Sequence, residues 1–135
     1  MNYIKLTQGF NNSKFIKEDD LYKSIISYNR DWYTSMFYYT KEHVDQVLSN
    51  PKFSVAGIHD LKTNKLWFDF DDKHNLQNAK NDALLVSNKL LSLGFNESNL
   101  QICFSGNKGF SIVVETDKML NPKEVLATCK QIASG

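Results

Sequence analysis

The chain has 135 residues, 41% of them hydrophobic and 23% charged, and its 16 basic and 15 acidic side chains leave a net charge of +1. This length is enough for one domain with a real hydrophobic core, and the composition excludes an intrinsically disordered chain. A net charge so close to zero gives no sign of a nucleic-acid partner. A carboxylate-rich metal site would, however, offset the charge of a local basic patch in this total.

The cysteines and histidines form no metal-binding or redox pattern. Cys103 and Cys129 lie outside any CxxC or Cys/His spacing, and the three histidines show no helical pairing, so a zinc site is not expected. No signal peptide and no apolar run of membrane length is visible. We therefore expect an intracellular, cytoplasmic protein with no membrane partner.

The first 52 residues predict an N-terminal α/β segment. Apolar residues recur at helical spacing after residue 18, and the acidic residues at the start of this segment favour a helix N-terminus. The many aromatic residues of 32–39 are typical of a covered strand. We expect, in order, a strand over 3–6, a polar loop over 9–14, a helix from 18 to about 29, a strand over 32–39, and a helix capped by Thr40 that runs to Leu48. Asn50 and Pro51 end that helix.

Residues 53–135 predict a hairpin, a long helix, a second hairpin and a final helix. The first hairpin joins 53–59 to 65–71, and the second joins 100–104 to 110–114. Between them apolar residues recur at spacings of three and four from 75 to 93, ahead of Gly94 as a C-cap. Asn121 and Pro122 begin the last helix. We expect one domain over 1–135, in which 65–71 and the second hairpin share an antiparallel sheet backed by the long helix.

The predicted strand 66–71 carries two aspartates, Asp69 and Asp71, at its C-terminal end. Because side chains alternate along a strand, both point to the same face, with Cα atoms about 6.5–7 Å apart. Two carboxylates so close repel one another unless a cation or a proton lies between them. Hard oxygen ligands suit Mg²⁺ or Mn²⁺, so the pair predicts a metal site for phosphoryl transfer. The alternative is a pair of solvated aspartates on an exposed strand.

A polar turn bracketed by glycines joins the strands of the second hairpin. It consists of Ser105, Gly106, Asn107, Lys108 and Gly109. Glycines let backbone amides turn towards an anion, and serine, lysine and amides together suit a triphosphate. An ordinary tight turn is the alternative. Ser111 follows on the outgoing strand, where we expect its side chain on the face opposite to its apolar neighbours. The face that carries the aspartates is the candidate for this position.

The two motifs together resemble those of the archaeo-eukaryotic primases and primase-polymerases. The first motif of that family is an apolar strand ending in Asp-x-Asp, here 66–71, and the second reads Ser-Gly-x-x-Gly-aromatic-His-apolar, here 105–112. The resemblance covers roughly 53–116 and implies an α+β fold, with helices packed against an RRM-like antiparallel sheet.

The resemblance also implies the activity of a metal-dependent nucleotidyltransferase that makes primers. It implies Mg²⁺ or Mn²⁺ on Asp69 and Asp71, nucleoside triphosphates as substrates and a DNA template. The expected nucleotide-binding residues are Ser105, Gly106, Asn107, Lys108, Gly109 and Ser111.

Two features depart from the family pattern. Ser111 stands in place of the histidine of the second motif, which removes a positive charge. The family also needs a third acidic residue on a strand beyond the last helix, and Glu115 and Asp117 lie too close to the second hairpin to replace it. We therefore expect an incomplete catalytic core from a viral, plasmid or microbial replication system. Its further partners would be the remainder of the catalytic domain or a replicative helicase.

Two other functions agree with parts of the sequence. A non-catalytic RRM-like module that binds nucleic acid or nucleotides would explain the missing acid and histidine, with Tyr33 or Trp67 stacking on bases. A haloacid-dehalogenase-like phosphatase also has an Asp-x-Asp strand end, and Ser105 could match its later serine. However, that class has small residues after Asp-x-Asp, and its acidic strand opens a parallel sheet.

Overall fold

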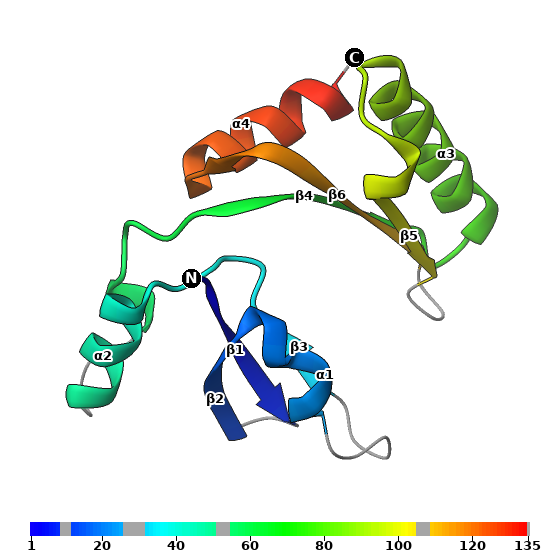
Figure 1. The fold of residues 1–135 in the computed structure, drawn as a ribbon. Coiled ribbons are helices and arrows are strands. Elements are labelled where there is room, and N and C mark those ends of the chain that lie inside the picture. Colours follow the sequence, from blue (N-terminus) through cyan, green and yellow to red (C-terminus); the bar gives the residue numbers. More distant parts are fainter. Residues whose placement is uncertain (9–11, 26–31, 51–54, 105–108, 135) are drawn as a thin grey trace. The chain divides into compact units, whose positions relative to one another are not determined.

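The computed structural model describes residues 1–8, 12–25, 32–50, 55–104 and 109–134, and over these ranges the chain is an α+β protein, as predicted (Figure 1). It divides into two compact units, Met1–Thr63 and Asn64–Gly135. Each unit contributes strands to a three-stranded sheet of its own. The single domain with segments 1–52 and 53–135 stays a prediction. No helix in the described part of the chain has both the length and the apolar character needed to cross a bilayer.

The N-terminal unit is built on a sheet with strand order β2-β1-β3. Its strands are β1 (Tyr3–Gln8), β2 (Asn12–Lys17) and β3 (Trp32–Thr34), its helices are α1 (Leu21–Ser24) and α2 (Lys41–Ser49), and 3₁₀ turns lie at Glu18–Asp20 and Val55–Gly57. β1 pairs antiparallel with both neighbours. Alternate residues of β1, Ile4 and Leu6, are buried in the core. The strand predicted at the N-terminus is therefore confirmed.

Two predictions for the start of this unit are wrong in part. Residues 12–14, which we expected in a loop, open β2, and the hydroxyls of Ser13 and Thr7 are hydrogen-bonded across the strand pair at 2.8 Å. Helix α1 ends at Ser24 rather than near residue 29. The Ser24 hydroxyl donates to the carbonyl of Asp20, a bond that weakens the end of a helix, and Ile25 is extended. The rest of the predicted loop and helix, 9–11 and 26–29, lies outside the described ranges.

The aromatic segment is a shorter strand than predicted. β3 ends at Thr34, and Tyr38 and Tyr39 form only isolated bridges instead of the strand centre expected there. Ser35 explains the break, because its hydroxyl accepts from the amide of Lys5 and donates to the carbonyl of Phe37. A side chain thus takes the place of regular strand pairing.

Helix α2 begins at the predicted Thr40 cap. The Thr40 hydroxyl accepts from the amide of His43 at 3.2 Å, and the Thr40 amide donates to Nδ1 of His43 at 3.1 Å. Because Nδ1 accepts, Nε2 carries the proton and donates to Asp60, 2.8 Å away. This hydrogen bond is the main reason why the pKa of Asp60 lies below its usual value. A histidine therefore fills the capping-box position and ties α2 to the segment before β4.

The C-terminal unit is an antiparallel sheet with its helices on one face (Figure 1). Its strands lie in the spatial order β4 (Thr63–Asp71), β6 (Gly109–Leu120) and β5 (Leu100–Phe104), and its helices are α3 (Leu76–Ser92) and α4 (Pro122–Ala133), with a 3₁₀ turn at Glu97–Asn99. The acidic strand, the long helix, the second strand pair and the last helix are confirmed. The finer RRM-like topology stays a prediction.

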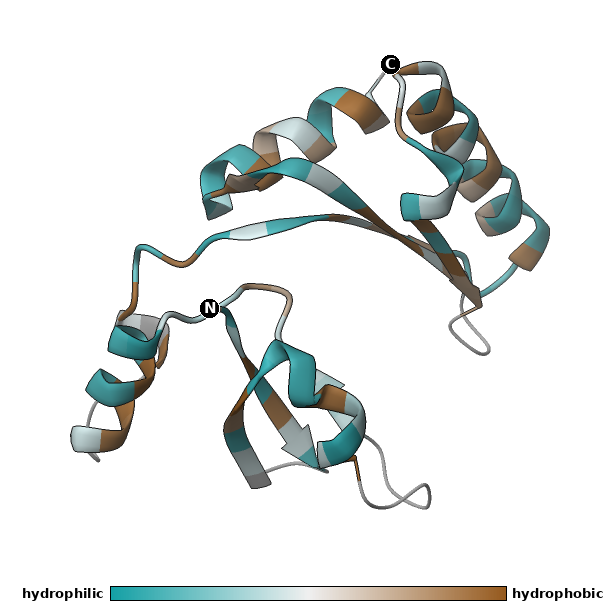
Figure 2. Ribbon diagram, viewed as in Figure 1, coloured by the Kyte–Doolittle hydropathy of each residue, from teal (hydrophilic) through white to brown (hydrophobic). Residues whose placement is uncertain are grey.

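The core of this unit lies between the sheet and the two helices, whose apolar and polar residues alternate along their length (Figure 2). The buried apolar side chains are Leu66 and Phe68 of β4, Ile112, Val114 and Leu120 of β6, Ala79, Ala83, Val86 and Leu90 of α3, and Val125 and Ile132 of α4. Because side chains alternate along strands, the residues between these on β4 and β6 point to the other face of the sheet. No helix of this unit covers that face within the described residues, and we call it the open face.

Local signals set the ends of both helices. The Asn75 side chain caps α3 by accepting from the next amides, and Gly94 after the helix has φ of +97°, the left-handed conformation expected at a C-cap. Asn121 and Glu124 form a capping box for α4, with Pro122 in the first turn. The predicted C-cap at Gly94 and the predicted start of α4 at Asn121 are confirmed, whereas the Asn75 cap was not predicted.

The first predicted hairpin is wrong. Residues 55–57 form a 3₁₀ turn, 53 and 54 lie outside the described ranges, and β4 pairs with β6 rather than with its predecessor. With 12 residues, β6 is long enough to pair with the whole of the nine-residue β4. On both strands buried residues alternate with more exposed ones, and the buried residues lie beneath the helices. That shared core outweighs the turn-forming residues that favoured a local hairpin.

Candidate functional site

β4 presents Asp69 and Asp71 on the open face. Leu66 and Phe68 are buried beneath the helices, at 0% and 7% exposure, so the alternation of the strand turns both aspartates the other way. Both side chains are exposed to solvent. The strand therefore places two carboxylates on one surface, with Cα atoms about 6.5–7 Å apart by strand rise.

The first residue of β6, Gly109, lies directly against the end of β4. A methyl group added at Gly109 would coincide with the carbonyl oxygen of Phe70, and it would lie 2.8 Å from the carbonyl carbon of Phe70 and 3.1 Å from Cα of Asp71. Only a residue without a side chain fits so close to another backbone. The start of the second motif is thus packed against the end of the first.

Ser111 faces the aspartates across the strand pair. At the other end of the pair, the Thr116 hydroxyl donates to the carbonyl of Asn64 at 3.1 Å. Thr116 therefore lies opposite Asn64, and Gly109 lies opposite Asp71. Counting along both antiparallel strands from either pair places Ser111 opposite Asp69, with both side chains on the open face. Cys103 of β5 lies opposite Ser111 in turn. The open face therefore carries a polar row of carboxylate, hydroxyl and thiol.

The next aspartate, Asp72, organises the loop that follows β4. One carboxylate oxygen accepts from the amides of His74 and Asn75, each at 3.0 Å, and the other accepts from the side-chain amide of Asn78 at 3.4 Å. The two backbone hydrogen bonds, that of Asn75 foremost, hold the pKa of Asp72 below its usual value. Asp72 thus connects the acidic strand to the first turn of α3.

By contrast, Asp69 and Asp71 have no hydrogen-bond or ion-pair partner among the described residues. Asp72 is occupied by the loop, which leaves the other two carboxylates open to an external cation. This difference separates a structural aspartate from two candidate ligands. Asp72 is not among the site residues predicted from the sequence, although the Asp72–Asn75 spacing is typical of such a loop.

Replacing Asp72 by alanine should lower the unfolding midpoint of the C-terminal unit by a few degrees at neutral pH. A carboxyl with a lowered folded-state pKa stabilises the fold fully above its unfolded pKa of about 3.9 and loses this effect as the pH falls through the lower folded value. The difference between the wild type and the variant should therefore be constant from pH 7 to about 5 and shrink below about 4. Thermal unfolding followed by circular dichroism measures this, and a difference that grows in acid would contradict the assignment.

The donor set of the open face suits a magnesium-like ion. Two exposed carboxylates offer hard oxygen ligands, and such ions keep several waters or bind substrate phosphates in addition to one or two protein carboxylates. Among the described residues, no three histidine, cysteine, aspartate or glutamate side chains come close enough to share a metal. Asp69 and Asp71 thus offer two of the oxygen ligands that such an ion needs.

A second polar feature of the open face lies at its other end. Lys65, Gln101 and Glu115, with Ser98 and Asn99, line a hollow of about 220 Å³. Lys65 is about 13 Å along β4 from Asp69 by strand rise. Glu115 lines the same hollow as Lys65 and is therefore too far from Asp69 and Asp71 to be a third ligand beside them. This agrees with the sequence analysis, in which Glu115 was rejected as the third acidic residue.

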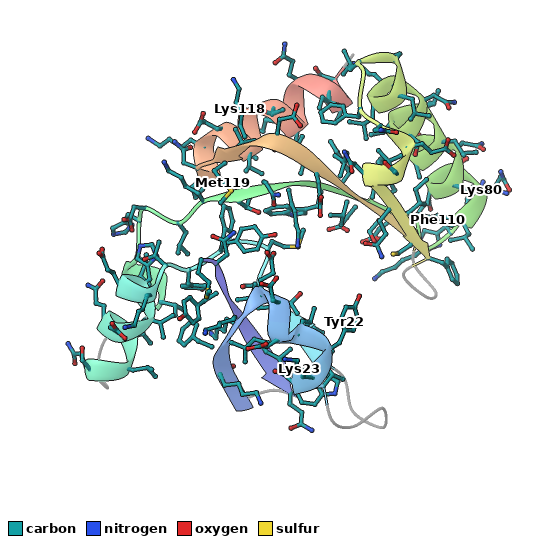
Figure 3. All side chains as sticks on the ribbon, in the orientation of Figure 1. Tyr22, Lys23, Lys80, Phe110, Lys118 and Met119 are labelled. Carbon is teal, nitrogen blue, oxygen red and sulfur yellow. The ribbon has the colours of Figure 1, made fainter. Side chains whose placement is uncertain are left out.

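The predicted nucleotide-binding residues are only partly described by the structure. Ser105, Gly106, Asn107 and Lys108 lie outside the described ranges, and their role stays a prediction. Gly109 and Ser111 are both brought next to the aspartates. Phe110, between them, contacts Phe104 of β5 with ring centroids 5.4 Å apart, and Figure 3 shows it at the end of β6 opposite to Lys118 and Met119.

Comparison with known proteins gives one informative match. No family model and no solved structure matches the chain. The chain is 38% identical over 60 residues to the DNA primase small subunit PriS of Methanocaldococcus jannaschii. Part of the chain is homologous to an archaeal primase. The match includes 43% of this chain but spans only 17% of the length of the primase subunit.

This relative is an archaeo-eukaryotic primase, which is the family predicted from the two motifs. The predicted resemblance is confirmed as partial homology. Because so little of the primase subunit is matched, its activity, substrates and partners reach this chain only as proposals.

Proposed function

We propose that this chain is part of a primase-polymerase-type nucleotidyltransferase, in which Asp69 and Asp71 bind Mg²⁺ or Mn²⁺ and the start of β6 receives a nucleoside triphosphate. The observation that carries the proposal is the packing of Gly109 against Phe70 and Asp71. It brings a backbone suited to phosphate next to carboxylates suited to the metal that phosphate carries. The partial homology to a primase supports the same reaction class.

The residues of the chain have separate tasks in this proposal. A bound divalent ion would neutralise the charge of the triphosphate and polarise the phosphorus that is attacked. Asp69 and Asp71 hold that ion, and Gly109 lets the start of β6 approach the end of β4 closely enough to bring its backbone beside them. Ser111, opposite Asp69, donates one hydrogen bond to a phosphate oxygen. The proposed contacts of Ser105 to Lys108 add amides and one positive charge.

The sheet order supports the RRM-like interpretation that we propose for this unit. A helix follows β4 and another follows β6, and β6 lies between β4 and β5. β4 is an edge strand among the described residues, so a further strand carrying a third carboxylate has room to pair with it. We propose that the remainder of the catalytic domain or another polypeptide supplies this group, and that a DNA template lies on the open face.

The sheet argues against one alternative function, and an experiment distinguishes the other from the proposal. In the haloacid-dehalogenase-like phosphatases the acidic strand belongs to a parallel sheet, whereas β4 lies at the edge of an antiparallel one. A non-catalytic RRM-like module is favoured by Ser111 in place of histidine. It would leave Tyr33, which is 57% exposed, and Trp67 to contact nucleic acid.

Calorimetric titration of a nucleoside triphosphate in the presence of Mn²⁺ tests the proposal. We expect saturable binding by the wild type and at least a tenfold loss in the Asp69→Asn/Asp71→Asn variant, because each lost charge–metal contact removes well over 1 kcal/mol. Asp82→Asn/Glu97→Gln removes the same charge from exposed positions of the same unit and should bind like the wild type. Equal binding by all three proteins would favour the non-catalytic module.

A further inference from the structure

The outer side of strand β5 is open. β5 lies at the end of the strand order β4-β6-β5, and it pairs with β6 from Leu100 to Phe104. Among the described residues, no backbone hydrogen bond joins this strand to any segment other than β6. Alternate N–H and C=O groups of β5 therefore point outward from the sheet, available to another strand. We call this side of β5 the free edge.

The sequence of β5 does not protect the free edge. Edge strands are commonly blunted by charged residues or proline, and β4, at the opposite edge, carries Lys65, Asp69 and Asp71. β5 reads Leu-Gln-Ile-Cys-Phe and contains neither a charge nor a proline. An uncharged strand with a free edge is a template on which a further strand can pair.

Two apolar side chains of β5 are exposed on the helix side of the sheet. Ile102 lies opposite the buried Ile112, so Ile102 and Phe104 face the helices. They are nevertheless 49% and 59% exposed. The layer of helices therefore stops short of β5.

Helix α3 is the helix next to this uncovered strand. α4 lies over β4, because the Cys129 thiol donates to the carbonyl of Trp67 at 3.6 Å. α3 packs on β6 beside α4 and thus lies on the β5 side of the sheet (Figure 1). One flank of α3 faces α4, and the other faces the free edge.

The flank of α3 towards the free edge carries exposed leucines. Leu85 and Lys89 line a groove with α4, and Leu84 and Leu91 lie about 100–160° round the helix from them, on the other flank. Both leucines are exposed. With the two β5 side chains they form what we call the edge strip: Leu84, Leu91, Ile102 and Phe104. At roughly 100 Å² apiece the strip offers about 400 Å² per copy, so that two strips and two strand backbones approach the ~1,000 Å² of a specific interface.

We propose that two copies of this chain pair antiparallel through their free edges, about a two-fold axis that passes through the sheet at Ile102. The strand is self-complementary about this residue, because apolar side chains alternate symmetrically with Gln101 and Cys103. Leu100 of each copy lies opposite Phe104 of the other, and no like charges are opposed. A two-fold interface requires such a match of one patch with itself. The second copy supplies both the free edge and the edge strip that cover their counterparts.

The charges at the two ends of β5 fit the same pairing. Glu97 lies just before β5. Lys80 lies near the end of β5, because α3 begins after β4, which ends beside Gly109, and Phe104 pairs with Phe110 there. Figure 3 shows Lys80 on the side of α3 away from α4. Neither charge has an ion-pair partner among the described residues, and antiparallel pairing brings Glu97 of each copy towards Lys80 of the other.

The dimer is a continuous six-stranded sheet in the order β4-β6-β5-β5-β6-β4. Because the axis is perpendicular to the sheet, the open faces of both copies lie on the same side. The two edge strips meet on the other side, between the two α3 helices. The pairing involves neither Asp69 nor Asp71, so it is tested independently of the proposed function.

Sedimentation equilibrium of the full chain over a wide range of concentrations tests the inference. The average mass should rise from that of one chain to that of two and no further. Ile102→Lys places two like charges across the axis and should weaken the dimer about tenfold or more. Leu126→Lys makes the same change at an exposed position of α4 and should dimerise like the wild type. Circular dichroism verifies that each variant is folded.

Charge reversal separates the pairing from an effect on folding. Lys80→Glu turns two attractions across the interface into two repulsions and should weaken the dimer about fivefold. Lys80→Glu/Glu97→Lys restores the attractions with the charges exchanged and should recover the affinity of the wild type. Failure of the double variant to recover it would contradict the proposed pairing.

Disulfide formation tests the register. Opposite residues of an antiparallel pair have Cα atoms about 4.5–5.5 Å apart, within the range of a disulfide. Ile102→Cys/Cys103→Ser should therefore give a covalent dimer on mild oxidation, whereas Gln101→Cys/Cys103→Ser should not. A chain that stays monomeric at all concentrations, a mass that grows beyond two chains, or equal losses in Ile102→Lys and Leu126→Lys would overturn the inference.

Discussion

Replacing Gly109 by alanine is expected to lower the free energy of unfolding of the C-terminal unit by about 3 kcal/mol, the upper end of the usual cost of overpacking. The added methyl group would coincide with the carbonyl oxygen of Phe70, which belongs to a backbone and has no alternative rotamer. The ends of β4 and β6 would have to separate. Denaturant unfolding followed by circular dichroism measures the loss.

Gly94 provides the matched control for this substitution. Its φ is +97°, yet a methyl group there would meet nothing within 4 Å. Gly94→Ala therefore carries only the conformational cost of a left-handed residue, about 1–2 kcal/mol. If Gly109→Ala costs no more than Gly94→Ala, the close approach of the two motifs is wrong. A Gly109→Ala protein that is as stable as the wild type would contradict it most clearly.

Mn²⁺ should stabilise the wild-type C-terminal unit and leave the Asp69→Asn/Asp71→Asn variant unaffected. A ligand that binds only the folded state adds about 2.7 kcal/mol when its free concentration is 100 times Kd. Without metal, the variant should unfold at the same or a slightly higher temperature, because the substitution removes two like charges from one strand face. Thermal unfolding in EDTA and in a series of Mn²⁺ concentrations gives both results.

The exposed pair Asp82→Asn/Glu97→Gln controls for the general effect of charge in this experiment. It should retain the full stabilisation by Mn²⁺. A metal effect that persists in the Asp69/Asp71 variant, or disappears in the control, would place the ion elsewhere on the protein.

The elements with strong local signals could be predicted from the sequence. Helix α3 has a long apolar periodicity between the Asn75 cap and Gly94, and α4 begins with a complete capping box. β5 and the start of β6 were also predicted, because few residues separate their two apolar runs in the sequence. In each case the residues that decide the structure are close together in the chain.

The elements that depend on distant partners could not be predicted in this way. The partner of β4 is β6, some 40 residues later, and its preference for β6 over the neighbouring segment comes from the core under α3 and α4. β2 begins with polar residues, so only its pairing with β1 makes it a strand. Ser24 ends α1 and Ser35 ends β3 through side-chain hydrogen bonds, which the spacing of apolar residues does not predict.

The candidate site was predictable in its acidic half and less so elsewhere. Asp69 and Asp71 follow from alternation along one strand. The contact of Gly109 with Phe70 follows from the pairing of two distant strands, and from the sequence we predicted only that both segments share one sheet.

Paramagnetic broadening by Mn²⁺ tests most directly the claim that the two motifs form one metal–nucleotide site. In a ¹⁵N-labelled wild-type protein, substoichiometric Mn²⁺ should first broaden the amide signals of Asp69, Asp71, Gly109 and Ser111, and adding a nucleoside triphosphate should strengthen this effect. Signals at the start of α4 should persist, because this turn follows the far end of β6, about 30 Å from Ser111 by strand rise. Broadening centred away from the end of β4, or unchanged in the Asp69→Asn/Asp71→Asn variant, would contradict the account.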